Sequence, residues 1–187
     1  MVITGNDPTR IKWLITQLGQ EFSIKDLGFI HHFLGIEAHY TNNGLFLCQT
    51  RYAGDILHCA SMQSSRPIST PMPEKGRHLP STDGPYPDPS HYRSLVGALQ
   101  YLTFTRPDLS YSVNFACQFM HSPTMAHYKL VKRILRYVRG TTSLGIIIHA
   151  SSTLDLYGFS DADWAGCPTT RRSTTGFCTF LGSNCIS

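Results

Sequence analysis

The sequence predicts an α+β fold, in which antiparallel strands and helices occupy separate blocks of a chain of 187 residues. Strand-like segments around a short connection occur twice, at residues 33–49 and 154–182. Between them, residues 92–140 carry apolar side chains at the three-four spacing of helices, and residues 10–22 and 50–60 repeat that pattern beside the first strand pair. Runs of strands and runs of helices in succession are typical of α+β proteins.

Residues 1–63 combine two helices with a hairpin. Residues 10–22 predict an amphipathic helix that covers a sheet, with the apolar positions Ile11, Leu14, Ile15, Leu18 and Phe22. Residues 33–40 and 44–49 alternate as strands around a turn at residues 41–44, and a helix from Thr50 to about Ala60 follows. Gly35 falls within the first of these strands, where a glycine permits close approach by another backbone.

Residues 64–90 predict a linker. They hold most of the eleven prolines together with Gly76 and Gly84, a composition that resists helices and strands. The segment is interpreted as a connector or as an extended strap on the surface. A proline-rich ligand for an aromatic groove of a partner protein is the alternative.

Residues 91–150 predict a basic helical region. Helices are expected at residues 92–102, from Arg106 to about Met120, and at residues 123–140, before a strand at residues 144–149 that we expect to pair with residues 154–159. The segment from His91 to Ala150 contains seven lysines and arginines and one acidic residue, Asp108. The third helix has a dry face and a basic face, which carries Lys129, Lys132, Arg133, Arg136 and Arg139. Such a row can bind nucleic-acid phosphates whatever the base sequence. The alternative is an ordinary helix surface that contacts only solvent.

Residues 151–187 predict a strand, an acidic turn and a second strand. Asp161 and Asp163 are one residue apart, so their carboxylates leave the same face of a strand or converge in a turn. Either arrangement can share Mg²⁺, which is commonly held by one or two carboxylates while water and substrate phosphate fill its other positions. The alternative is that both residues only form the turn.

Composition and charge narrow the class of protein. The net charge of +4 tolerates a nucleic-acid partner without singling one out. The six cysteines form no CxxC pair and no Cys/His arrangement with zinc spacing, so we interpret them as reduced and mostly buried thiols. The sequence has no secretory signal pattern and no apolar run long enough to cross a membrane. We therefore expect an intracellular protein without membrane contact and leave its compartment open.

The stretch SDADWAG, followed by RRSTTGFCTFLG, resembles the opening of the ribonuclease H domain in copia-type LTR retrotransposon Pol polyproteins. The resemblance implies a ribonuclease H-like fold whose first antiparallel strands are residues 151–187. It also implies that Asp161 is the first carboxylate of a two-metal site, with Asp163 as a second possible ligand. The remaining acidic ligands of that family lie further along, beyond Ser187, so we expect the site in this chain to be incomplete.

The stretch DLGFIHHFLGIEAHYTNNGLFLCQTRYAGDIL resembles the end of the palm and the start of the thumb in a copia-type reverse transcriptase. FLGIE occupies the place of the hairpin that holds the primer terminus, which implies that Phe33, Leu34 and Gly35 contact nucleic acid. Packing within the hairpin is the alternative for the two apolar residues. The family's YVDD turn, which carries the polymerase aspartates, occurs nowhere in these residues. Residues 91–150 resemble the connection segment that precedes ribonuclease H.

These likenesses together predict four parts: a palm end and thumb start (residues 1–63), a linker (64–90), a helical connection (91–150) and the first ribonuclease H-like strands (151–187). We expect the segment to come from an RNA-directed DNA polymerase and ribonuclease H, and to be inactive alone. Its expected partners are an RNA–DNA hybrid or another duplex and the rest of the polyprotein. Mg²⁺ is expected in the intact parent enzyme and not tightly bound here. The alternative is a non-catalytic remnant that at most binds nucleic acid passively.

Overall fold

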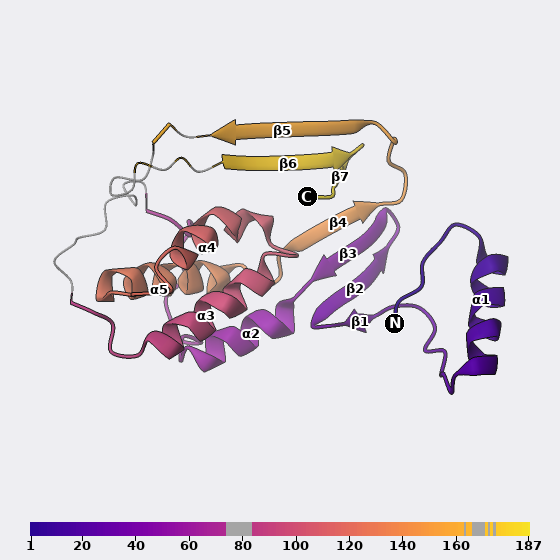
Figure 1. Ribbon diagram of the computed structural model, residues 1–187, viewed down its shortest axis with the longest axis horizontal. Coiled ribbons are helices and arrows are strands. Elements are labelled where there is room, and N and C mark those ends of the chain that lie inside the picture. The colour runs from indigo at the N-terminus through magenta and orange to yellow at the C-terminus, as the bar shows by residue number, and fades with distance from the viewer. Residues whose placement is uncertain (74–83, 163, 166–170, 172, 174) are drawn as a thin grey trace.

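The computed structural model describes residues 1–73, 84–162, 164, 165, 171, 173 and 175–187. Within these residues helices and antiparallel strands form separate blocks, as the α+β prediction requires (Figure 1). A helical block lies beside two small sheets, and one further helix stands apart near the N-terminus. None of the described helices is both long and apolar enough to span a bilayer.

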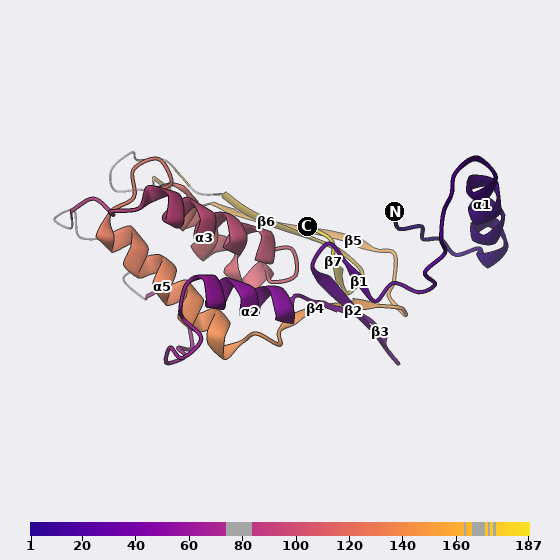
Figure 2. The ribbon, with the colours of Figure 1, turned by 90° about the horizontal axis from the view of Figure 1, so that it is seen from below.

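Helix α1 (Pro8–Glu21) forms where it was predicted but covers no sheet. Asp7 caps it, since Oδ1 accepts hydrogen bonds from the backbone N–H of Thr9 at 2.9 Å and of Arg10 at 3.2 Å. No residue of α1 is buried, and Figures 1 and 2 both show the helix away from the strands. The prediction that this helix covers a sheet is wrong for the described chain, because an apolar stripe requires a partner surface without specifying which one.

Strands β1 (His32–Phe33), β2 (Ile36–Thr41), β3 (Gly44–Cys48) and β4 (Gly145–His149) form an antiparallel sheet in that order. The predicted hairpin is confirmed as β2 and β3. The predicted pairing of residues 144–149 with 154–159 is wrong, because β4 instead joins the open edge of β3. A Cβ atom on Gly145 would lie 2.1 Å from the carbonyl oxygen of Leu47, so a glycine is what allows the two strands to approach.

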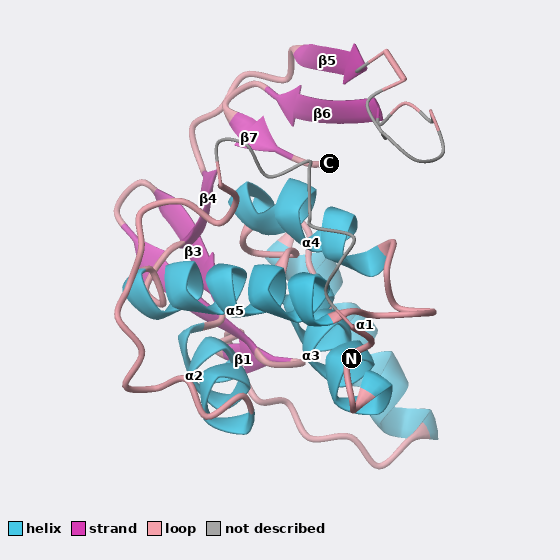
Figure 3. Ribbon diagram, turned by 90° about the vertical axis from the view of Figure 1, so that its left-hand side faces the viewer, coloured by secondary structure: helices cyan, strands magenta, loops and turns pink. Residues whose placement is uncertain are grey.

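The helical block consists of α2 (Thr50–Cys59), α3 (Pro89–Leu102), the 3₁₀ turn η1 (Pro107–Leu109), α4 (Ser110–Cys117) and α5 (Met125–Gly140), which Figure 3 shows packed together. The predicted helices are confirmed, although the second one begins as η1. Their apolar faces share one core, whose fully buried members include Tyr92, Val96, Leu99, Leu102, Leu109, Val113, Ile134 and Leu135. Burial of these side chains is the main source of stability in this part of the chain.

The predicted linker contains no helix or strand at residues 64–73 and 84–88, and an isolated bridge joins Pro85 to Thr124. Residues 74–83 lie outside the described residues. Arg106, which was counted with the basic surface, is instead 2% exposed inside the helical block. The prediction that Arg106 belongs to the basic surface is therefore wrong. Its guanidinium group is buried because Asp108 and Thr141 bind it there.

Strands β5 (Leu156–Ala162), β6 (Thr175–Leu181) and β7 (Asn184–Cys185) form the second antiparallel sheet, which confirms the two predicted strands. Every residue of β5 is exposed. The Asn184 side chain joins the two sheets: it accepts from the backbone N–H of His149 at 2.6 Å and donates to the His149 carbonyl oxygen at 3.2 Å.

Of the cysteines described, only Cys48 is buried, so the prediction of mostly buried thiols is wrong. Cys167 lies outside the described residues.

Candidate nucleic-acid interface

The predicted primer-holding residues Phe33, Leu34 and Gly35 form the tight turn from β1 to β2. Leu34 and Gly35 have positive φ angles of 49° and 75°, and the Leu34 side chain is 70% exposed. Gly35 therefore lies in a turn and not inside a strand, which corrects its predicted position. A Cβ atom there would meet Tyr101 at an ordinary 3.8 Å, so the backbone conformation and not crowding is what favours glycine.

Helix α3 holds this turn in place through Tyr101. The Tyr101 hydroxyl donates to the carbonyl oxygen of Leu34. The Tyr101 ring packs edge-on against Tyr52 of α2, with 5.3 Å between ring centroids, and against Phe104 at 5.4 Å. Burial, together with the neighbouring Tyr101, raises the pKa of Tyr52, so its hydroxyl stays protonated and donates to Ala98. These contacts attach the exposed turn to helices α2 and α3.

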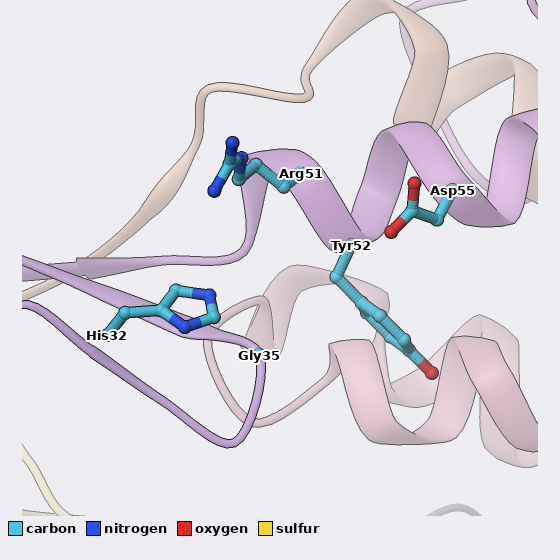
Figure 4. Close-up of a pocket in the computed structure, with 5 residues that line it drawn as sticks. All are labelled: His32, Gly35, Arg51, Tyr52 and Asp55. Carbon is cyan, nitrogen blue, oxygen red and sulfur yellow. The ribbon is translucent and has the colours of Figure 1, made fainter.

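A shallow pocket opens beside the turn. It is lined by His32, Gly35, Arg51, Tyr52 and Asp55, and Figure 4 shows the first two on the strand side and the other three on α2. Arg51 supplies a planar set of donors that suits a phosphate, and His32 can add another donor. Asp55 contributes a negative charge on the same helix. The pocket therefore offers hydrogen-bond donors from Arg51 and His32 and a carboxylate acceptor from Asp55.

Sequence reasoning did not select His32, Arg51, Tyr52, Asp55 or Tyr101. Arg51 and Asp55 had a usable signal, because a spacing of four residues at the start of a predicted helix places both on one face. The contact from Tyr101 had none, since 67 residues separate it from Leu34.

The arginines of the basic row on α5 bind other parts of the protein. Three arginines bind residues at or just before the start of the predicted linker: Arg133 donates to Thr70 Oγ1 at 2.8 Å, Arg136 Nε to the Arg66 carbonyl at 2.7 Å, and Arg139 Nε to the Gln63 carbonyl at 2.6 Å. This geometry favours the strap interpretation of residues 63–70. Each guanidinium group has five N–H donors. The Nε of Arg133 is buried without a partner, so the donors left for phosphate oxygens lie on the other guanidinium nitrogens.

The two lysines of the row, Lys129 and Lys132, are exposed on the same helix. The Lys132 ammonium lies 5.5 Å from the centroid of the Tyr128 ring, one helical turn earlier.

Asp161 is exposed in β5, next to the last residue of the strand and opposite Gly176 of β6. Asp163 lies outside the described residues, so whether the two carboxylates converge is not part of the structure described. The turn at Phe33, the row on α5 and Asp161 belong to three different parts of the fold, and the described structure does not join them into one site.

Comparison with known proteins gives matches over the whole chain. Residues 1–74 match the family described as reverse transcriptase (RNA-dependent DNA polymerase). The entire chain is 56% identical to the uncharacterized mitochondrial protein AtMg00810 of Arabidopsis thaliana and covers 78% of it.

The entire chain also aligns with two retrovirus-related Pol polyproteins. It is 46% identical to that from transposon RE1 of Arabidopsis thaliana and 33% identical to that from transposon TNT 1-94 of Nicotiana tabacum, but covers only 13% and 15% of their lengths. No solved structure matches the chain.

Proposed function

Because the chain belongs to the copia-type retrotransposon Pol family, we propose that it acts as the corresponding segment of an RNA-directed DNA polymerase and positions duplex nucleic acid. The observation that carries this proposal is the exposed turn at Phe33, Leu34 and Gly35, which Tyr101 holds beside the pocket. An exposed turn with an arginine beside it can contact a nucleic-acid backbone, whereas a hairpin with only a structural role needs neither the exposure nor the charge.

The basic row on α5 is proposed as a second phosphate contact. It adds affinity that does not depend on base sequence, because lysine and arginine release counterions from the duplex when they bind phosphates. The arginines serve two purposes in this proposal: they hold residues 63–70, and they offer phosphate oxygens the exposed donors that those contacts leave unused.

Two uncovered apolar surfaces support contact with other parts of the polyprotein. Helix α1 buries none of its residues, and Trp13 is 61% exposed. Strand β5 exposes Leu156 and Phe159 at 71% and 61%. Exposed apolar surface of this kind marks protein interaction sites. The proposed partner is the remainder of the polyprotein that the Pol relatives contain.

The finer proposal concerns Asp161, which we assign to a ribonuclease H-like site. Its exposed position near the end of a strand supports the assignment, because Mg²⁺ there could also bind water and a substrate phosphate. Bound Mg²⁺ would polarise the scissile phosphate and activate water. Asp161 would hold one coordination position of the ion. As a single carboxylate, it supports only loose binding.

Measurement of hybrid binding against salt tests the proposal. We expect a labelled RNA–DNA hybrid, followed by fluorescence anisotropy, to bind weakly and to lose affinity as salt rises. Arg51→Ala should lower the slope of log K against log[salt] by about 0.9, the value for one phosphate contact. Arg10→Ala is the matched control, because it removes the same charge from an exposed position on α1. Equal slope changes in both variants would refute a specific contact at the pocket.

A further inference from the structure

Strands β2 and β3 bring three metal-binding side chains to one place. Glu37 pairs with Cys48 across the hairpin, and His39 follows Glu37 by two residues, so its side chain leaves the same face of β2. One ligand atom from each residue lies within 4.8 Å of the other two, and Glu37 Oε2 is 3.7 Å from His39 Nε2. Over the described residues, this is the single cluster of three potential ligands that satisfies this spacing.

We propose that Glu37, His39 and Cys48 bind a zinc ion. Zinc binds thiolate at about 2.3 Å and imidazole or carboxylate at about 2.0–2.2 Å, so tetrahedral ligand atoms lie roughly 3.3–3.6 Å apart. The separations in the hairpin exceed that range by little more than 1 Å at most, which side-chain rotation can supply. A mixed set of sulfur, nitrogen and oxygen donors favours zinc over Mg²⁺ or Ca²⁺, which prefer oxygen.

Residues at the start of α2 orient two of the three ligands. The backbone N–H of Arg51 donates to Glu37 Oε1 at 2.9 Å, which leaves the other carboxylate oxygen beside His39. The Thr50 hydroxyl lies 3.6 Å from the Cys48 sulfur and donates to it. Such outer contacts are characteristic of metal sites, because they fix the ligands before the ion arrives. The N-terminus of α2 also favours the negative charge of a carboxylate and a thiolate.

Burial determines how the ion would enter. Cys48 is 3% exposed, while the side chains of Glu37 and His39 are 17% and 57% exposed. The ion would therefore approach from the His39 side and reach the sulfur last. The Cys48 thiol loses its proton as the sulfur–zinc bond forms, so each bound ion releases one proton and affinity falls as pH is lowered. Three protein ligands leave one position for water.

A bound ion would join β2 to β3 and so stiffen β2, the strand that follows the turn at Phe33, Leu34 and Gly35. This inference does not rest on the nucleic-acid function proposed above, since it depends only on the register of the hairpin and the identity of its side chains.

Cobalt(II) is the probe, because its thiolate charge-transfer band reports a sulfur ligand directly. We expect the reduced chain of 187 residues to bind one Co²⁺ with that band, and Zn²⁺ to displace it. Cys48→Ser should abolish the band, and His39→Gln should weaken Co²⁺ binding by at least about 10-fold, because the loss of a ligand costs no less than the loss of an outer contact. The matched controls are Cys59→Ser and His58→Gln, which alter exposed side chains of α2 and should change neither the band nor the affinity.

The result that overturns the proposal is an absent band in the wild-type chain, a band that survives Cys48→Ser, or unchanged affinity in His39→Gln. His39→Gln keeps the test valid if the buried cysteine variant misfolds, because more than half of the His39 side chain is exposed.

Discussion

Replacing Arg106 by Met should destabilise the helical block more than any surface substitution. Arg106 is 2% exposed and donates four hydrogen bonds: two to Asp108, at 2.9 and 2.8 Å, and two to Thr141, at 2.7 Å to its carbonyl and 2.8 Å to its hydroxyl. Its guanidinium carbon also lies 5.6 Å from the centroid of the Tyr137 ring. The residue thus connects η1 to the end of α5.

The expected loss follows from what the substitution leaves behind. Removing one partner of a buried ion pair typically costs about 3–5 kcal/mol, because the other charge stays buried and unpaired. The Asp108 side chain is 38% exposed, so water can solvate it after the substitution. That exposure places Arg106→Met near the low end, at about 3 kcal/mol. Asp108→Asn should cost more, since it leaves the cationic member in the buried position.

Urea unfolding, monitored by circular dichroism, measures the difference in free energy of unfolding between the wild type and each variant. Arg93→Met is the matched control: Arg93 is exposed on α3 and binds Ser90 at 3.1 Å. Surface substitutions of that kind usually stay within about 0.5 kcal/mol. A loss below about 1 kcal/mol for Arg106→Met, or one equal to that of Arg93→Met, would refute the argument that the buried Arg106 guanidinium stabilises the junction of η1 with the end of α5.

Acid titration tests the same pair. Burial alone would raise the pKa of Asp108, but its hydrogen bonds to Arg106, the Arg106 charge and the Tyr137 hydroxyl together lower it below the ordinary value of 3.8. A lowered carboxyl pKa contributes stability that is present above pH 3.8 and is lost as pH falls through the folded-state pKa. Wild type should lose this increment under acid, and Asp108→Asn should not.

Three further outcomes are expected. Burial lowers the pKa of His127 below its ordinary value of 6.5. In the capping box of α5, the neutral ring's Nδ1 accepts a hydrogen bond from the Thr124 backbone N–H. The free energy of unfolding should therefore fall as pH drops below 6.5. His127→Gln should flatten that part of a pH series of unfolding midpoints, because glutamine keeps an acceptor that does not titrate. Replacing Lys132 and Arg139 by Ala should lower the salt slope of hybrid binding by roughly two, and an unchanged slope would assign the row to ordinary solvation. The 187-residue chain should not cleave an RNA–DNA hybrid, whereas Asp161→Asn in a longer Pol protein that cleaves one should abolish cleavage; persistent cleavage there would remove Asp161 from the site.

Local features of this protein were readable from the sequence alone. The apolar stripes predicted the helices and the buried face of α5, and Asn43 and Gly44 marked the turn of the β2–β3 hairpin. The family was also readable, because motifs such as FLGIE and SDADWAG depend on the identity and order of nearby residues. Each of these signals acts over a few residues, where backbone geometry sets the spacing of side chains.

Contacts between distant segments were decided only by the tertiary structure. The pairing of β4 with β3, the burial of Arg106 against Thr141 and the contact of Tyr101 with Leu34 join residues that no local period relates. The same holds for the cluster at Cys48, which lacks zinc spacing along the chain and arises from strand register. Which partner an apolar stripe or a charged side chain finds depends on the packing of the whole chain, since many pairings satisfy the same local pattern.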